Sequence, residues 1–302
     1  MGIHFNGRVA IVTGAGGGLG RQHALQLAAR GAKVVVNDIG RPAPNEQGEL
    51  SSAADAVVAE IRAGGGQAIA HHTSVTDEAG VAAMVQQALS HWGRIDILVN
   101  NAGILRDKSF AKMDLADFRL VLDVHLMGAV ICTQAVWAHM RAQKYGRVVM
   151  TTSSSGLYGN FGQANYGAAK MALVGLMQTL SIEGARDGIR VNCLAPTAAT
   201  RMTEGLMPQA VLDKLAPESV TPGLLYLCSD EAPTRAILCA GAGTFERAYI
   251  TLTSGVHVGT GPDAAEQVAA QFEAISDRTG ETVPESGSAQ GQNEVGKAMA
   301  AG

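Results

Sequence analysis

A run of glycines between a short apolar stretch and a helical pattern limits the possible folds of this chain more than any other feature. Residues 9–13 are apolar and mostly β-branched, and Gly-Ala-Gly-Gly-Gly-Leu-Gly follows them at positions 14–20. A helical pattern occupies residues 19–30, and a second apolar run, 33–37, ends at Asp38. A strand, a helix and a strand in this order form a βαβ unit, which requires a parallel sheet.

The same alternation continues along most of the chain. Because βαβ crossovers are right-handed, we expect an α/β fold with a doubly wound parallel sheet, Rossmann-like in its strand order 3-2-1-4-5-6, followed by a last strand. Further helices are expected over residues 51–63, 77–92, 115–141 and 165–187, and further strands over 67–71, 95–100, 146–152 and 190–194.

The alternation stops after Gly243, so we expect a single catalytic domain over residues 1–243 with a C-terminal extension over 244–276. The extension contains the pattern of an amphipathic helix at 262–275. Residues 277–302 are rich in Gly, Ser, Gln and Glu, which predicts a mobile tail. A polar stretch at 40–50 contains two prolines and is long for a strand-to-helix connection.

Charge and cysteine content exclude several classes of partner and site. The formal charge of the 302 residues is −4 and no basic block appears, so nucleic acid and anionic membranes are not expected partners. Residues 120–137 are apolar but contain polar side chains, which indicates a buried helix rather than a membrane span. The four cysteines show no CxxC spacing, so we expect reduced thiols, no metal site and, without a signal peptide, a cytoplasmic protein.

The glycine run has the composition of a phosphate-binding turn. Glycine allows the backbone to approach a pyrophosphate, and the following helix directs its free N–H groups and positive dipole end at that anion. Asp38, about twenty residues further on, can accept hydrogen bonds from ribose hydroxyls and would repel a 2′-phosphate, so NAD is preferred to NADP. The expected cofactor residues are Gly14, Gly16, Gly18, Leu19, Gly20, Asp38, Ser74, Val75, Asn101, Ala102, Gly103, Tyr166, Lys170, Pro196 and Thr200.

Three polar residues form a candidate catalytic set. Tyr166 and Lys170 are four positions apart in a helical stretch and therefore share a face. An ammonium group beside the phenol would lower the phenol's pKa and make it a usable acid and base. Ser153, at the end of a predicted strand, could hold a carbonyl oxygen while hydride adds to the carbon.

With these residues in place, the chain resembles the short-chain dehydrogenase/reductase family over about residues 7–243. The family's nucleotide motif matches Thr13, Gly14, Gly18 and Gly20, and its active-site motif matches Ser153, Tyr166 and Lys170. The resemblance implies that Tyr166 donates and accepts a proton, that Lys170 anchors the ribose and modifies the pKa of the tyrosine, and that Ser153 positions the substrate.

Longer stretches resemble one branch of the family, the dehydrogenase domain of the peroxisomal multifunctional enzymes of β-oxidation. These stretches are residues 36–38, 100–107, 144–147 and 158–166. The resemblance implies NAD-dependent oxidation of (3R)-hydroxyacyl-CoA or of steroid 17β-alcohols. It also implies a homodimer or homotetramer formed through the helices at 115–141 and 165–187, with the C-terminal extension near the active site of a partner subunit.

The sequence departs from the family pattern at two places. His125 stands where the family usually has Asn, and a core histidine bonded to backbone and a proton-relay residue are both consistent with it. Thr197 replaces the glycine that usually follows Pro196. The segment after it, with Thr200, Met202 and Leu206, is expected to close over an apolar substrate, which Ser153 and Tyr166 also contact.

Three functions remain open at this point. The first is a 3-hydroxyacyl-CoA or hydroxysteroid dehydrogenase of lipid metabolism, for which the CoA thioester of a sterol side chain would satisfy both descriptions. The second is a 3-ketoacyl reductase acting on a carrier protein, which Asp38 disfavours because biosynthetic reduction usually draws on NADPH. The third is a non-catalytic NAD-sensing module, which the complete Ser153, Tyr166 and Lys170 set disfavours.

Overall fold

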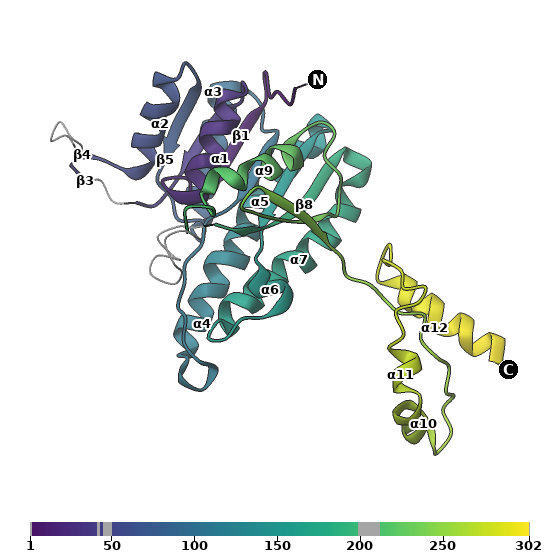
Figure 1. Cartoon of the computed structure of the whole chain (residues 1–302). Helices are drawn as coiled ribbons and strands as arrows, with labels where there is room; N and C mark the ends of the chain where they lie inside the picture. The colour runs from purple at the N-terminus through teal and green to yellow at the C-terminus, as the bar shows by residue number, and fades with distance from the viewer. Residues whose placement is uncertain (1, 41–42, 45–49, 199–211, 302) are drawn as a thin grey trace. The chain divides into compact units, whose positions relative to one another are not determined.

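A computed structural model describes residues 2–40, 43–44, 50–198 and 212–301 of the chain (Figure 1). The contacts divide the chain into two units, Met1–Arg247 and Ala248–Gly302, and each is described by itself. The first unit contains the glycine run and the candidate catalytic residues.

An eight-stranded sheet with the order β10-β9-β8-β7-β6-β1-β2-β5 forms the centre of the first unit. Strands β5 to β9 and the first two strands pair in parallel, which confirms the doubly wound sheet and the order 3-2-1-4-5-6 followed by a last strand. The strands are β1 (Val9–Thr13), β2 (Lys33–Asn37), β5 (Gln67–His71), β6 (Ile97–Asn100), β7 (Gly146–Thr151), β8 (Ile189–Thr197), β9 (Ile237–Gly241) and β10 (Thr244–Ala248).

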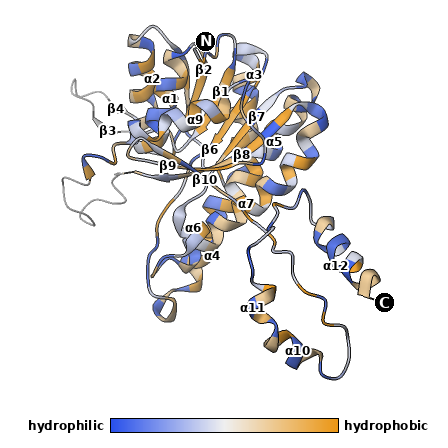
Figure 2. Cartoon of the chain, turned by 45° about the vertical axis from the view of Figure 1, so that its right-hand side comes forward, coloured by the Kyte–Doolittle hydropathy of each residue, from blue (hydrophilic) through white to orange (hydrophobic). Residues whose placement is uncertain are grey.

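Helices cover both faces of this sheet, and its apolar strands are therefore buried on both sides (Figure 2). One layer contains α1 (Gly18–Ala29), α2 (Ala53–Ala63) and α9 (Thr221–Cys228), whose buried side chains join those of the strands in one core cluster. The other contains α3 (Glu78–Trp92), α5 (Gly128–Gln143) and α7 (Ala164–Gly184).

Among the described residues, one helical stretch, Leu115–Gln143, is long enough and apolar enough by composition to cross a membrane. It consists of α4 (Leu115–Leu122), a π-helical turn (Asp123–Met127) and α5. In the structure α4 contacts α7, and α5 contacts α3, β6 and β7. Packing within the layered fold therefore accounts for part of the apolar composition that the sequence shows here, while Leu115, Leu120 and Met127 stay exposed.

Several short elements lie outside the sequence prediction. They are α6 (Ser154–Tyr158), α9, and the antiparallel pair β3 (Ala43–Pro44) and β4 (Leu50–Ser51), which lies in the stretch expected as a loop at 40–50. Strand β10 follows β9 after a two-residue connection, Ala242 and Gly243, in which both residues have positive φ. This tight hairpin adds β10 to the sheet after Gly243, where the sequence predicts that the alternation of strands and helices stops.

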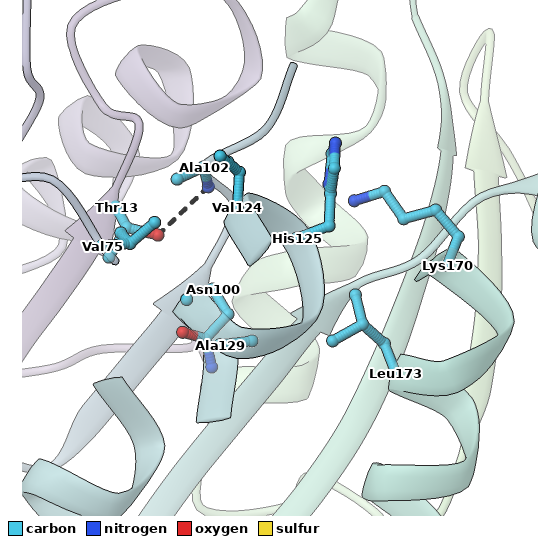
Figure 3. Close-up of a pocket in the computed structure, with 10 residues that line it drawn as sticks. Thr13, Val75, Asn100, Ala102, Val124, His125, Ala129, Lys170 and Leu173 are labelled. Atoms are coloured by element: carbon cyan, nitrogen blue, oxygen red, sulfur yellow. Dashed lines mark hydrogen bonds between the residues drawn. The ribbon is translucent and has the colours of Figure 1, made fainter. Parts of the chain in front are cut away.

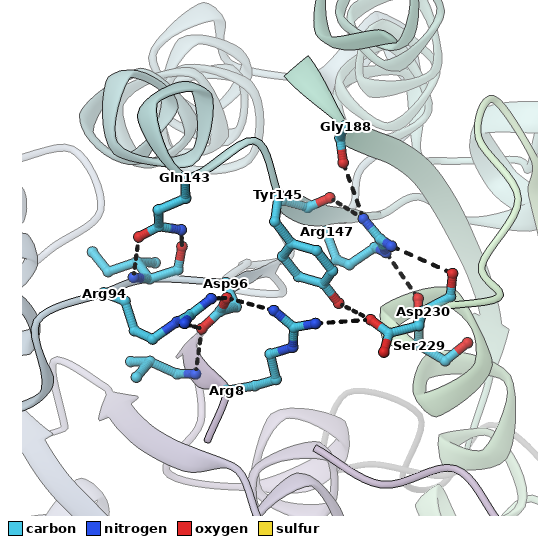
Figure 4. Close-up of polar contacts among 12 residues, drawn as sticks. Arg8, Arg94, Asp96, Gln143, Tyr145, Arg147, Gly188, Ser229 and Asp230 are labelled. Carbon is cyan, nitrogen blue, oxygen red and sulfur yellow. Dashed lines mark hydrogen bonds and ion pairs between the residues drawn. The ribbon is translucent and has the colours of Figure 1, made fainter. Parts of the chain in front are cut away.

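Charged side chains join three strands at their amino-terminal ends, where β1, β6 and β7 begin (Figure 4). Asp96 is fully buried and accepts hydrogen bonds from Arg8, Arg94 and the backbone N–H of Val9. The Tyr145 ring lies between two guanidinium groups, at 3.6 Å from that of Arg8 and 4.2 Å from that of Arg147. These contacts give the motif at 144–147 a structural role.

The second unit has little interior of its own. It contains α10 (Ala264–Ala270), α11 (Phe272–Ile275) and α12 (Ser288–Ala301), and its Leu252 and Thr282 pair as an isolated bridge. None of its described side chains is buried. The helix expected at 262–275 corresponds to α10 and α11, and α12 occupies most of the stretch expected as a mobile tail.

Candidate active site

The glycine run forms a tight turn at the carboxyl end of β1, next to the end of β6. Gly14 has a φ of +61°, and a Cβ atom on it would lie 2.8 Å from the Ala102 Cα. The Thr13 hydroxyl accepts a hydrogen bond from the Asn101 N–H at 3.0 Å. It accepts another from the Ala102 N–H at 3.1 Å (Figure 3). The loops that follow β1 and β6 are therefore held together. Asn101 and Ala102, which the sequence predicts to contact the cofactor, lie against the glycine turn.

The first turn of α1 is suited to bind an anion. Its N-cap is Gly17, no side chain caps the helix, and the first turn contains no acidic residue. The N–H groups at this end therefore keep free hydrogen-bonding capacity and a positive dipole end. A Cβ atom on Gly20 would overlap the Gly14 carbonyl oxygen, so the turn depends on glycine there. This geometry fits the pyrophosphate of a dinucleotide.

Asp38 lies beside the glycine turn, as the sequence predicts for a ribose-binding carboxylate. Its Oδ2 accepts a hydrogen bond from the Gly16 N–H at 2.9 Å, and its Oδ1 accepts one from the Gly40 N–H at 2.8 Å. A carboxylate oxygen can accept more than one hydrogen bond, so both remain available to ribose hydroxyls. A negative charge at this position would repel the 2′-phosphate that NADP carries on this ribose.

The other expected cofactor residues are distributed around the same edge of the sheet. Val75 is buried against Gly128, and the Ser74 hydroxyl lies 2.8 Å from that of Thr76. Pro196 lies near the end of β8. Thr200, Met202 and Leu206 are outside the described residues, so their expected roles in binding cofactor and substrate stay predictions.

Ser153 and Tyr166 are brought together by two helices. Ser153 is the N-cap of α6, and its hydroxyl accepts a hydrogen bond from the Ser155 N–H at 3.2 Å. Tyr166 lies in the first turn of α7, where burial raises the pKa of the phenol and the nearby Ser153 hydroxyl acts in the opposite direction. A serine hydroxyl and a tyrosine hydroxyl therefore face a common site at the end of β7.

The electrostatics of Tyr166 differ from the expectation. Burial raises the pKa of the phenol above its ordinary value, more than the Ser153 hydroxyl lowers it. Lys170 is buried, donates a hydrogen bond to the Thr151 carbonyl at 2.5 Å, and has its Nζ 5.4 Å from the centre of the Tyr166 ring. Burial lowers the pKa of Lys170 to about 7. The expected lowering of the Tyr166 pKa by Lys170 is thus absent from this arrangement, because desolvation dominates both groups.

His125 lies in the π-helical turn and is buried beside these groups (Figure 3). Its Nε2 is 3.0 Å from the N–H nitrogen of Ile104 and 2.8 Å from the Ile104 carbonyl oxygen, and its ring meets that of Tyr166 edge-on at 5.2 Å. Burial, and then the charge of Lys170, lower the pKa of His125 to about 3, so the ring is neutral. Its Nδ1 is buried without a hydrogen-bond partner among the described residues. The backbone contact to Ile104 is what the core-histidine interpretation expects.

Sequence reasoning gave no role to three polar residues close to Tyr166. Asn165 is fully buried, its Nδ2 donates to the Arg106 carbonyl at 3.0 Å, and its Oδ1 accepts from the Tyr166 N–H at 2.7 Å. Gln163 and Asp107 are hydrogen-bonded to each other at 2.7 Å. The signal available in the sequence was a polar residue, Gln163, directly before the helix that contains Tyr166.

Comparison with known proteins agrees with this geometry. The profile of the short chain dehydrogenase family matches residues 8–210. A putative short-chain type dehydrogenase/reductase of Mycobacterium tuberculosis is 49% identical over 274 residues, which are 90% of this chain and 95% of that protein. The peroxisomal multifunctional enzyme type 2 of Drosophila melanogaster is 53% identical over 228 residues, which are 76% of this chain and 38% of that enzyme.

Solved structures show the same likeness. The full-length Drosophila enzyme matches with a TM-score of 0.82 and 38% identity, over 99% of this chain and 50% of that one. A 7α-hydroxysteroid dehydrogenase in complex with NADH and 7-oxo glycochenodeoxycholic acid matches with a TM-score of 0.70 and 31% identity, over 80% of this chain and 95% of that one. The chain thus spans half or less of the multifunctional enzyme and nearly the whole of the other two relatives.

Proposed function

Because the chain belongs to the short-chain dehydrogenase family, and so acts on CH–OH groups with a nicotinamide cofactor, we propose that it oxidises a (3R)-3-hydroxyacyl-CoA to the 3-ketoacyl-CoA with NAD. The observation that carries the proposal is the Ser153 and Tyr166 pair beside an uncapped glycine turn, in a chain of which 228 residues are 53% identical to part of a peroxisomal multifunctional enzyme. A 17β-hydroxysteroid, or the CoA thioester of a sterol side chain, belongs to the same proposal.

The chemistry follows from the positions of the side chains. NAD, when bound, supplies the carbon atom that accepts the hydride. The Ser153 hydroxyl donates a hydrogen bond to the substrate oxygen and holds it beside the phenol. Tyr166 in its phenolate form removes the hydroxyl proton as hydride leaves the substrate carbon. Lys170, with a pKa of about 7, can hold a positive charge near the phenolate once a ligand supplies a partner.

Asp38 supports NAD rather than NADP as the cofactor. Its two oxygens are fixed by backbone N–H groups beside the turn that fits the pyrophosphate. A 2′-phosphate on the ribose would meet this carboxylate at close range, and like charges in a partly buried site repel strongly.

Exposed apolar side chains on two helical segments support an oligomer. Leu115 is 65% exposed, and Leu120 and Met127 follow it along the same helical stretch at 41% and 44%. Met171 and Ile182 are exposed on α7. We propose that these surfaces meet in a homodimer or homotetramer, which sedimentation velocity of the purified chain would detect as a species heavier than 31.2 kDa.

A substrate panel tests the proposed function. The purified protein is incubated with NAD or NADP and with short, long and steroid-bearing 3-hydroxyacyl-CoA thioesters and free 17β-hydroxysteroids, and kcat/KM is measured from the absorbance of the reduced cofactor. We expect the highest kcat/KM for a CoA thioester with NAD. Strong preference for NADPH and a carrier-protein ketoacyl substrate would favour the reductase, and NAD binding without turnover of any substrate would favour the sensing module.

A further inference from the structure

The loop at residues 104–109 is attached to the start of α7 by hydrogen bonds from three consecutive residues. The Arg106 carbonyl accepts a hydrogen bond from Asn165 Nδ2 at 3.0 Å, and the Lys108 N–H donates one to the Gly162 carbonyl at 2.9 Å. Between them, Asp107 Oδ2 accepts a hydrogen bond from Gln163 Nε2 at 2.7 Å. The loop and the first turn of the catalytic helix are thus one connected structure.

Gln163 continues this connection to the second catalytic residue. It is the residue directly before α7, and its Oε1 accepts a hydrogen bond from the Ser155 hydroxyl at 2.7 Å. The Ser155 N–H in turn donates to the Ser153 hydroxyl at 3.2 Å. A chain of hydrogen bonds therefore runs from Asp107 through Gln163 and Ser155 to Ser153. Gln163 is also joined to Tyr166 through the backbone of the first turn of α7.

We infer that Asp107 is a positioning residue for the oxidation, because its carboxylate orients Gln163 and thereby holds Ser153 and the first turn of α7 in their catalytic arrangement. This inference rests on the proposed function, since it concerns the reaction at the same two residues. An ionised carboxylate is a stronger acceptor for the Gln163 amide than a neutral group would be.

The charge of Asp107 also acts on Tyr166. It raises the pKa of the phenol, in the same direction as burial. The other titratable groups around the phenol are Lys170, which is buried against the Thr151 carbonyl, and His125, whose ring is neutral. Arg106 and Lys108 flank Asp107 in sequence, but their cationic groups lie 3.6 and 3.7 Å from Asp117. Removing the charge of Asp107 should therefore lower the pKa of Tyr166.

Two substitutions separate the hydrogen bond from the charge. In Asp107→Asn the amide oxygen can still accept from Gln163, but the charge is gone. In Asp107→Ala both are lost. Because alcohol oxidation needs the phenolate, kcat/KM rises with pH as Tyr166 ionises. We expect the acidic limb of this profile to move to lower pH in both variants, and plateau kcat to fall roughly tenfold in Asp107→Ala only.

Asp117→Asn is the matched control, because it removes one carboxylate that pairs with the same loop and has no hydrogen bond to Gln163. Its pH profile should coincide with that of the unmodified protein. Profiles of Asp107→Asn and Asp107→Ala that also coincide, with unchanged plateau kcat, would overturn the inference. Melting temperatures of all variants show whether any loss of rate comes from unfolding.

A second readout needs no substrate. Phenolate absorbance in the ultraviolet is titrated for the protein and for Asp107→Asn, and the Tyr166 contribution is obtained by subtracting the same titration of a Tyr166→Phe partner variant. A lower midpoint in Asp107→Asn supports the action of the Asp107 charge on Tyr166, and an equal or higher midpoint contradicts it. If the unmodified protein oxidises no substrate in the panel, the proposed function fails, whereas this titration still decides whether the charge of Asp107 acts on the phenol.

Discussion

The Asp38 carboxylate is fixed by the N–H groups of Gly16 and Gly40, so its charge has a defined place beside the glycine turn that we propose binds the cofactor. Replacing it by Asn keeps the size of the side chain and removes the charge. We expect Asp38→Asn to lower the ratio of kcat/KM for NAD to that for NADP by about tenfold or more, which corresponds to about 1.4 kcal/mol. The control Glu183→Gln removes one exposed carboxylate and should leave the ratio unchanged.

In the proposed mechanism, the proton transfer depends on Tyr166. Tyr166→Phe keeps the ring and its edge contact with His125 and removes only the hydroxyl. The oxidation rate should fall by roughly 10²- to 10⁴-fold, the range usually contributed by general acid–base catalysis, with NAD affinity retained. Tyr226→Phe on α9 serves as the control. A Tyr166→Phe variant that oxidises substrate at the original rate would rule out the proposed mechanism.

At the scale of elements, the βαβ units were predictable because each long strand and helix has its own apolar pattern. Strands β1, β2 and β5 have the bounds that the sequence predicts, and most long helices agree within a few residues. The short elements α6 and β10 were not predictable, since a tight turn and contacts with the rest of the fold determine them. The pKa shifts of Tyr166 and Lys170 were missed for a similar reason, because spacing along a helix shows which groups are near but not how deeply they are buried.

The charged network where β1, β6 and β7 begin makes a prediction about stability (Figure 4). Asp96→Asn leaves two arginines and a backbone N–H without their shared carboxylate. We expect the free energy of unfolding in urea to fall by about 3 kcal/mol. The exposed pair of Arg21 and Glu60 offers a control, since Glu60→Gln should cost less than about 1 kcal/mol. Equal losses in the two variants would mean that the network contributes no more than a surface pair.

For the whole molecule, two buried histidines predict how stability depends on pH. Burial lowers the pKa of His23 to about 3, and burial with Lys170 does the same for His125. Between pH 6.5 and 3 the unfolded chain binds protons that the folded chain does not, so the free energy of unfolding falls as the pH falls. Each histidine contributes at most about 1.4 kcal/mol per pH unit.

Urea unfolding between pH 7 and pH 5 measures this slope. His125→Asn and His23→Gln should each reduce it. A slope that both core variants leave unchanged would contradict the neutral, buried state of these rings.

We expect that the second unit does not fold on its own. Its 55 residues, Ala248–Gly302, contain no buried side chain among those described, while Tyr249, Phe272 and Met299 are more than half exposed. Without a core, the gain from burying apolar surface cannot offset the entropy lost on folding. A peptide of residues 248–302 should therefore show the circular dichroism of an unfolded chain, and a cooperative thermal transition would disprove this.

The crowded glycine turn has a consequence for the gene as well as for the protein. Every change at the first or second base of a glycine codon introduces a side chain or a stop. At Gly20 any side chain meets the Gly14 carbonyl, so all such mutations there should be lost under selection for activity. Gly175 on α7 has open space around it and should accept many of them. A saturation-mutagenesis library should therefore retain only silent changes at the Gly20 codon and many substitutions at the Gly175 codon.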